Sequence, residues 1–322
     1  MRALITGIGG FAGSYLAEHL LAAGCDEIWG VILTGPGQAA HLQDQVRLVE
    51  ADLTDPERVR DLLAAVQPDR IYHLAGQSFV AISWRDPWPT LETNIRAQLN
   101  LLEAMVRLRL NARILVVGSQ DEYGKVEADE LPIQETTPLR PDSPYGVSKV
   151  TQDLLGLQYF YSYGVHAVRV RPFNHIGPRQ NDRFVVPAFS HQIAEAEVGL
   201  RPAVIHVGNL ETARDFSDVR DIVRAYHLLL ERGTAGEVYN IGRGRPYPIR
   251  TLLALLLDMS TIEITIVQDP KRLRPSDVPV SYADISKIRA AVGWEPRISF
   301  ETSVRDVLEY WRAQVAEVVR NR

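Results

Sequence analysis

The stretch "RALITGIGGFAG" (residues 2–13) decides the fold, because a short apolar run passes directly into a glycine-rich turn. Residues 2–6 are typical of a buried β-strand. Residues 13–24 have the apolar spacing of an amphipathic helix that ends at Gly24. A strand that enters a helix through such a turn predicts the start of a strand–helix–strand unit.

Three glycines, Gly7, Gly10 and Gly13, fall between this strand and this helix with the spacing GxxGxxG. Glycines let the backbone turn tightly and approach a pyrophosphate, and the helix N-terminus offers unpaired N–H groups and a positive dipole. A plain tight turn is the alternative use of such glycines. The position between a strand and a helix is the one that a dinucleotide motif requires, so we predict a dinucleotide site here.

The alternation of strand and helix continues through the first half of the chain. It predicts a parallel sheet with helices on both faces, which is a doubly wound α/β domain. Beyond about residue 175, prolines, glycines and arginines become frequent around short strands and helices, which indicates a smaller C-terminal α/β lobe. We expect residues 1–175 to form the dinucleotide-binding domain, residues of about 210–245 to return to it, and residues 176–322 to form mainly the substrate lobe. The further strands that we expect are residues 27–33, 46–53, 70–75, 113–119 and 166–172, and the further helices are residues 55–67, 90–108 and 143–163.

Composition narrows the class of protein. The net charge of −5 offers no basic face for nucleic acid. The single cysteine, Cys25, excludes an internal disulfide and a cysteine-based metal cluster, and it fits a reducing compartment. No apolar run reaches membrane-spanning length, and the N-terminal residues lack the pattern of a secretory signal. We therefore expect a cytoplasmic protein without a nucleic-acid or membrane partner.

The ends of the next strands bear on the cofactor. An acidic residue after the second strand would favour NAD and an arginine would favour NADP, but Leu33 and Thr34 stand there, so the choice stays open. Asp52, after the third strand, is a candidate for the adenine edge, or alternatively an N-cap for the helix that follows. Ala75 and Gly76 end the fourth strand, where small residues let a cofactor lie close.

A hydride-transfer site is predicted from three residues. Ser119 ends the strand at residues 113–119 and faces the crevice beyond the sheet, where cofactors bind. Tyr145 begins the next helix, and Lys149 lies one turn further on the same face. We expect the lysine ammonium to lower the pKa of the tyrosine, and the serine hydroxyl to hold a carbonyl or alcohol oxygen. The alternative is a packed tyrosine and a solvated lysine.

The motifs "TGIGGFAG", "HLAGQS", "GSQDEYG", "SPYGVSK" and "RPFNHIGPRQ" resemble those of the extended short-chain dehydrogenase/reductases, a family of nucleotide-sugar epimerases, dehydratases and reductases. The resemblance covers essentially the whole chain. It implies a Rossmann fold, a nicotinamide cofactor (NADH or NADPH), a catalytic set of Ser119, Tyr145 and Lys149, and a homodimer that packs through residues 90–108 and 146–163. It also implies that Pro172, Phe173 and Asn174 flank the nicotinamide and the sugar. The cofactor contacts that we assign on this basis are Gly7, Gly10, Phe11, Gly13, Thr34, Asp52, Leu53, Leu74, Ala75, Gly76, Asn94, Tyr145, Lys149 and Pro172.

The segments "FNHIGPRQ", "VGNLETARDFSDVRD" and "LRPSDVP" are most similar to family members that act on GDP-mannose and on its 4-keto-6-deoxy derivative. Dehydratases of the family carry Glu two residues before the tyrosine of "DEYG", where this chain has Asp121. Aspartate is one methylene shorter, and proton abstraction needs hydrogen-bond reach. We therefore favour reduction at C4 to GDP-D-rhamnose. The 4,6-dehydratase reaction, with Asp121 as base, is the alternative. We expect Glu122 to face away, because neighbouring strand residues point to opposite faces.

The resemblance also supplies substrate contacts. Arg214 and Arg274 match phosphate-binding positions, since arginine gives bidentate charge-assisted contacts to a diphosphate. Asp277 matches a residue that accepts hydrogen bonds from a ribose. The full set that we assign to the GDP-sugar is Gln120, Asn174, Arg179, Val185, Arg214, Arg274 and Asp277. A chain of this fold that has lost catalysis and acts as a cofactor sensor or scaffold is the remote alternative.

Overall fold

A parallel sheet of seven strands forms the centre of the protein in the computed structural model, which describes residues 1–270 and 278–321. The strands lie in the order β10-β6-β5-β4-β1-β2-β3, and every neighbouring pair is parallel. This order reverses direction at β1, as in doubly wound nucleotide-binding sheets, and it opens a crevice beyond the carboxyl ends of the strands. The strand bounds are β1 (Arg2–Thr6), β2 (Glu27–Ile32), β3 (Arg47–Glu50), β4 (Arg70–His73), β5 (Arg113–Val117), β6 (His166–Pro172) and β10 (Val238–Ile241).

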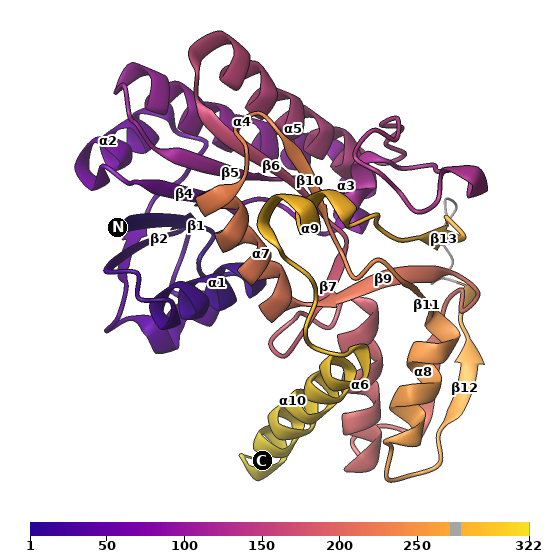
Figure 1. Cartoon of the computed structure of the whole chain (residues 1–322). Coiled ribbons are helices and arrows are strands. Elements are labelled where there is room, and N and C mark those ends of the chain that lie inside the picture. The colour runs from indigo at the N-terminus through magenta and orange to yellow at the C-terminus, as the bar shows by residue number, and fades with distance from the viewer. Residues whose placement is uncertain (271–277, 322) are drawn as a thin grey trace.

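Helices cover both faces of this sheet (Figure 1), so the expected doubly wound fold is confirmed. One face packs against α1 (Phe11–Ala22), α7 (Val219–Arg232) and α9 (Ser286–Val292). The other face packs against α2 (Pro56–Val66), α4 (Pro87–Arg107) and α5 (Pro144–Tyr163). Each face buries its own apolar cluster, because strands covered on both sides expose no polar face to water.

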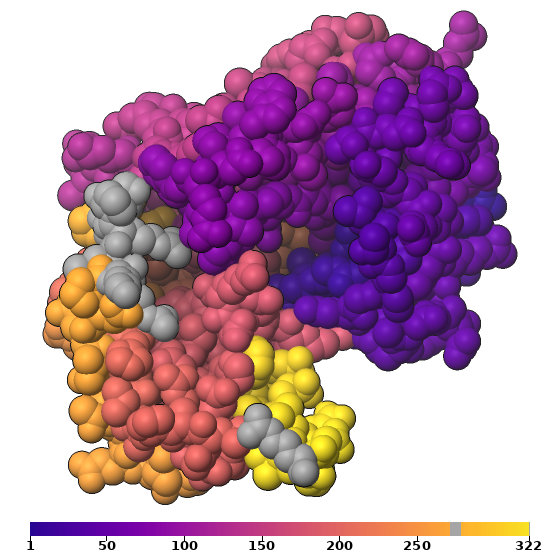
Figure 2. All heavy atoms as spheres, turned by 180° about the vertical axis from the view of Figure 1, so that it is seen from behind, coloured from indigo at the N-terminus to yellow at the C-terminus, as the bar shows by residue number. Residues whose placement is uncertain are grey.

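A second lobe lies beyond the carboxyl ends of the strands. It holds its own buried apolar cluster between α6 (Val185–Glu197), α8 (Ile249–Asp258) and α10 (Phe300–Arg320). In Figure 2 its residues lie below and to the left of the indigo-to-purple first third of the chain. Its strands are β7 (Asn174–Ile176), β8 (Val204–Val207), β9 (Ala213–Asp218), β11 (Pro246–Pro248), β12 (Thr265–Gln268) and β13 (Val280–Ser281).

The chain passes from one lobe to the other more than once. We expected residues of about 210–245 to return to the dinucleotide-binding domain. Within them, α7 packs against α1, and β10 pairs with β6 of the large sheet. The helix α9 also packs beside α7 and β10. The residue limits of the two domains stay a prediction.

Two differences from the expected elements matter for the site. The fifth strand ends at Val117, so Ser119 follows the strand instead of ending it. Residues Gln120–Glu122 form a short 3-10 helix, η2, which turns the chain sharply after Ser119. The expectation that Asp121 and Glu122 alternate as strand residues is therefore wrong.

The described residues contain neither a membrane-spanning helix nor a cluster of metal-ligating side chains. No helix there is long and apolar enough to cross a membrane. No group of three or more His, Cys, Asp or Glu side chains there is arranged to hold a metal ion.

Candidate active site

The glycine turn brings the backbone of β1 close to the N-terminus of α1. Gly7 has φ +72°, and a Cβ there would lie 2.9 Å from backbone atoms of Ala75. A Cβ on Gly13 would lie 2.2 Å from the carbonyl oxygen of Gly7, so only glycine permits this close approach. Gly10 precedes α1, and no side chain in the described part of the chain caps that helix. Its first N–H groups therefore suit an anion such as a pyrophosphate.

The fourth strand ends beside this turn. The Thr6 hydroxyl accepts a hydrogen bond from the backbone N–H of Ala75 at 3.1 Å and contacts Nδ1 of the buried His73 at 2.8 Å. Asn94 is fully buried; its Oδ1 accepts the N–H of Gln77 at 2.8 Å, and its Nδ2 donates to Ser148 at 2.9 Å. Asn94 thus ties the turn after β4 to the helix that carries Tyr145.

Other residues assigned to the cofactor have contacts within the protein. Asp52 is exposed, and its Oδ1 accepts the N–H and the hydroxyl of Thr54, both at 2.8 Å. Asp55, the residue after Thr54, is the one that caps α2. The Phe11 ring stacks on the ring of His175 with centroids 6.0 Å apart. Among the rest, Leu53 and Pro172 are buried, Leu74 is half-buried, and Thr34 is exposed two residues after the end of β2.

Ser119 and Asp121 contact each other directly. The Ser119 hydroxyl donates a hydrogen bond to Oδ2 of Asp121 at 2.8 Å and accepts the backbone N–H of Asp121 at 3.1 Å. A Cβ on Gly146 would lie 2.6 Å from the carbonyl oxygen of Asp121, so the turn packs tightly against the first turn of α5. Gln120 points to the second lobe, where its Oε1 accepts the hydroxyl of Ser281 at 3.0 Å.

Helix α5 presents Tyr145 and Lys149 to this turn. The helix begins at Pro144, and the Ser143 hydroxyl caps it by accepting the N–H of Gly146 at 3.0 Å. Both side chains are buried, and the Tyr145 hydroxyl hydrogen-bonds to Ser119. The Lys149 ammonium lies 5.8 Å from the centre of the Tyr145 ring and donates to the carbonyl of Val117 at 2.9 Å. The structure therefore brings Ser119, Tyr145 and Lys149 together.

The pKa values of these groups differ from the expectation. Burial raises the pKa of Tyr145 well above that of a free phenol; the Asp121 carboxylate raises it too, whereas the hydrogen bond with Ser119 lowers it. Burial lowers the pKa of Lys149 to about 8, and the nearby Glu122 opposes that shift. The net lowering of the Tyr145 pKa that we expected is wrong for this structure, because desolvation by burial is the largest cause of its shift. Tyr145 is thus a neutral phenol, the form that donates a proton.

A buried ionic network behind the catalytic turn was missed from the sequence. Arg171 pairs with Glu122 and with Asp153, and Arg169 also pairs with Asp153. The Arg171 guanidinium lies 5.0 Å from the centre of the Tyr123 ring. One signal was available: the strand "HAVRVRP" carries two arginines at alternate positions of an otherwise apolar run, and buried arginines require partners.

The residues assigned to the substrate lie on several elements of the second lobe. Asn174 begins β7, and its Nδ2 is buried without a hydrogen-bond partner among the described residues. Val185 begins α6 and is half-buried. Arg214 lies on β9, where it donates to the carbonyls of Ala213 at 3.0 Å and Val278 at 2.7 Å. Arg274 and Asp277 lie outside the described residues.

Arg179 is engaged on the cofactor side of the protein. Its guanidinium binds both oxygens of Glu18 on α1, at 2.6 and 3.0 Å, and lies 3.9 Å from the centre of the Tyr15 ring. The backbone carbonyl of Arg179 accepts a hydrogen bond from Gln38 at 2.7 Å. These contacts link α1 to the segment that enters the second lobe. We therefore leave Arg179 out of the proposed substrate site.

Comparison with known proteins gives a consistent result over the whole chain. The family model described as GDP-mannose 4,6 dehydratase matches residues 4–307. The chain is 37% identical to GDP-6-deoxy-D-mannose reductase of Pseudomonas aeruginosa, over 98% of this chain and 99% of that protein. It is 31% identical to GDP-mannose 4,6-dehydratase of Yersinia enterocolitica, over 93% of this chain and 91% of that protein.

Solved structures agree with this assignment. The structure of RMD from Pseudomonas aeruginosa complexed with NADPH superposes with a TM-score of 0.85 and 35% identity, covering 97% of this chain and 99% of that one. A UDP-glucose 4-epimerase from Thermotoga maritima, solved with UDP-glucose, gives a TM-score of 0.88 and 30% identity, covering 98% and 100%. The chain therefore belongs to the GDP-mannose 4,6-dehydratase family within the extended short-chain dehydrogenase/reductases.

Proposed function

We propose that this protein reduces the C4 ketone of GDP-4-keto-6-deoxy-D-mannose to give GDP-D-rhamnose. The observation that carries the proposal is the hydrogen bond from the Ser119 hydroxyl to the Asp121 carboxylate, at 2.8 Å. By resemblance, the dehydratases of this family place a longer glutamate at that position to remove the proton at C5. A carboxylate that is shorter and held by the serine has less reach toward a sugar carbon.

The relatives support the same choice. The reductase of Pseudomonas aeruginosa is 37% identical, and the dehydratase of Yersinia enterocolitica is 31% identical over a smaller share of the chain. The dehydratase reaction stays the second candidate, because the family includes both activities.

The residues of the site have separate roles in this reduction. The buried Tyr145 phenol, hydrogen-bonded to Ser119, donates the proton that the C4 oxygen takes up as it becomes a hydroxyl. When the substrate binds, the Ser119 hydroxyl turns from Asp121 to donate to that oxygen, and the positive charge on Lys149 favours release of the tyrosine proton. We infer that Asn174 binds the sugar, because its buried amide donor lacks a partner within the described residues.

The glycine turn fits a nicotinamide dinucleotide, which supplies the hydride. Gly7 and Gly13 leave no room for a Cβ, and the uncapped N-terminus of α1 within the described residues suits the pyrophosphate. The Pseudomonas aeruginosa structure contains NADPH, whereas DesIV of Streptomyces venezuelae contains NAD. We propose NADPH or NADH for this chain and leave the choice to the assay below.

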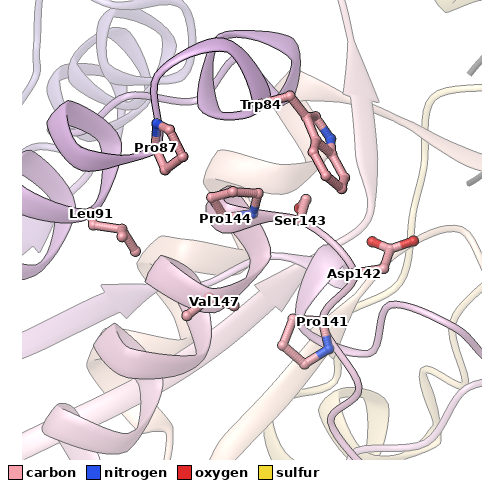
Figure 3. Close-up of a pocket in the computed structure, with 8 residues that line it drawn as sticks. All are labelled: Trp84, Pro87, Leu91, Pro141, Asp142, Ser143, Pro144 and Val147. Atoms are coloured by element: carbon pink, nitrogen blue, oxygen red, sulfur yellow. The ribbon is translucent and has the colours of Figure 1, made fainter. Parts of the chain in front are cut away.

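We also propose that the protein works in the cytoplasm as a homodimer. Along α5, Val147, Leu154 and Tyr161 recur at intervals of seven residues and are 44%, 50% and 75% exposed. If two α5 helices pack antiparallel about Leu154, Val147 faces Tyr161 of the partner subunit. Beside Val147 lies a shallow pocket of about 420 Å³ whose wall includes the exposed Trp84 (Figure 3). The side chain of Tyr161 has the size and apolar character to enter it.

The activity is tested with two parallel incubations of the purified protein. One contains GDP-4-keto-6-deoxy-D-mannose with NADPH or NADH; the other contains GDP-mannose with catalytic NADP⁺ or NAD⁺. We expect loss of nicotinamide absorbance and GDP-rhamnose by NMR in the first incubation alone, and the faster coenzyme identifies the cofactor. Formation of the keto sugar from GDP-mannose would instead make the protein a dehydratase. The variant Asp121→Glu, which restores the longer carboxylate, tests whether reach decides between the two reactions.

The homodimer is tested by light scattering after size exclusion. Leu154→Arg places two like charges at the two-fold axis, so we expect it to halve the measured mass. Ile266→Glu, at a similarly exposed apolar position on β12 of the second lobe, is the matched control and keeps the wild-type mass. A wild-type monomer, or a dimer that survives Leu154→Arg, contradicts the proposal.

A further inference from the structure

The carboxyl group of Glu122 is built into the turn that carries Ser119. Its side chain has no exposed surface, and its Oε1 accepts the backbone N–H of Ser119 at 2.9 Å. A Cβ on Gly118 would lie 2.0 Å from the same oxygen, so the residue that follows β5 has to be glycine for this carboxyl to fit. The Glu122 side chain thus fixes the backbone of Ser119, three residues earlier in the chain.

The second oxygen of Glu122 is linked, through Arg171 on β6, to the helix that carries the rest of the site. Oε2 accepts the Nε–H of Arg171 at 2.8 Å, and Arg171 Nε lies 2.8 Å from Oδ2 of Asp153. Asp153 is on α5, two helical turns beyond Tyr145 and on the same helix as Lys149. Glu122 and Arg171 therefore form a second link between the Ser119 turn and α5, in addition to the direct contact between Ser119 and Tyr145.

Both carboxyl oxygens of Glu122 accept hydrogen bonds, and two charged side chains, Arg171 and Asp153, face the group. Burial raises the pKa of the Glu122 carboxyl, Asp153 raises it further, and Arg171 lowers it. A neutral carboxyl group still accepts the Ser119 N–H through its carbonyl oxygen. The amide of glutamine has the same shape and offers Ser119 the same acceptor oxygen, while its NH2 group takes the place of the oxygen that faces Arg171.

We propose that Glu122 is a positioning residue for the reaction, which holds Ser119 at the distance from Tyr145 that hydride and proton transfer require. The proposal rests on the proposed reductase function. It predicts that kcat depends more on the oxygen of residue 122 that accepts the Ser119 N–H than on the charge of that residue. The reason is that this hydrogen bond maintains the geometry of the turn. Small displacements of a reacting group are costly in rate even when binding is unchanged.

The test compares Glu122→Val, which removes the acceptor, with Glu122→Gln, which keeps it. We expect Glu122→Val to lower kcat roughly tenfold to a hundredfold with little change in the KM for the nicotinamide cofactor, and Glu122→Gln to keep most of the wild-type kcat. Asp221→Asn is the matched control, because Asp221 is also buried and also accepts backbone N–H groups, from Arg297 at 2.8 Å and Ile298 at 2.9 Å. This control is expected to unfold at a lower temperature with an unchanged kcat.

Two results overturn the proposal. One is a Glu122→Val enzyme that keeps the wild-type kcat; the other is an equal loss of kcat in Glu122→Val, Glu122→Gln and Asp221→Asn, which indicates a general effect of losing a buried carboxylate. Amide hydrogen exchange of residues 117–123 is measured in parallel without substrate. Faster exchange there in Glu122→Val than in Glu122→Gln supports the positioning role even if wild-type protein fails to reduce the keto sugar, so the two failures are distinguishable.

Discussion

The Lys149 ammonium donates a hydrogen bond to the backbone carbonyl of Val117 at 2.9 Å, which anchors the helix of the site to the end of the central strand β5. The same ammonium is buried beside the Tyr145 ring. A lysine in this setting holds its proton less firmly than a solvated one, because burial penalises the charged form. Its charge, and hence its help to the tyrosine, depends on pH near neutrality.

The first prediction follows from the pKa of Lys149, which burial lowers to about 8. The protonated lysine is the active form, so kcat/KM for reduction should fall as the pH rises through about 8. Initial rates between pH 6 and 10 measure this. Lys149→Arg keeps its charge over that range and should lose the alkaline fall while retaining some activity. A wild-type profile that is flat to pH 10 would contradict the role of the lysine charge.

The second prediction concerns the proton donor. Tyr145→Phe removes the phenol and should lower kcat by roughly 10²- to 10⁴-fold, the usual contribution of a positioned acid. Tyr159→Phe on the same helix is the matched control, since Tyr159 is also buried and its hydroxyl contacts Glu103 on α4. We expect Tyr159→Phe to keep the wild-type kcat. Equal rates for Tyr145→Phe and wild type would remove Tyr145 from the mechanism.

The third prediction separates backbone strain from lost space in the glycine turn. Gly7 and Gly24 have similar positive φ angles, +72° and +79°, but only a Cβ at Gly7 would meet another backbone segment, at 2.9 Å. At Gly24 nothing among the described residues lies within 4 Å of that Cβ. Gly7→Ala should therefore weaken binding of the nicotinamide cofactor at least tenfold, whereas Gly24→Ala should cost about 1 kcal/mol of stability and no affinity. Fluorescence titration and thermal unfolding measure both.

Much of the fold and part of the site could be predicted from sequence, because those features are local. The strand, glycine turn and helix at residues 2–24 form one continuous signal, and the spacing of Tyr145 and Lys149 puts both on one helix face. The pKa of Tyr145 could not be predicted, since it depends on burial and on Asp121 more than on its helical neighbour. The role of Glu122 was also inaccessible, because its partner Arg171 lies far along the chain and because a 3-10 turn replaced the expected strand.

The last prediction concerns Asp215, a fully buried carboxylate on β9 that joins three segments of the second lobe. Its oxygens accept the backbone N–H groups of Arg243 at 2.7 Å, Gly244 at 2.9 Å and Ala283 at 3.2 Å. Burial raises its pKa from the ordinary 3.8 to about 6, and those hydrogen bonds oppose the shift. Between these two pH values the folded protein holds a proton that the unfolded chain has released.

The sign of the pH effect follows from this difference. Because the folded state binds more protons, the contribution of Asp215 to the free energy of unfolding decreases as the pH rises from about 4 to 6. Asp215→Asn does not titrate, so the stability of wild type minus that of the variant isolates this group. We expect that difference to shrink by on the order of 3 kcal/mol between pH 4 and pH 7, as measured by denaturant unfolding. A difference that stays constant or grows with pH would show that Asp215 is already ionised in the folded protein at pH 4.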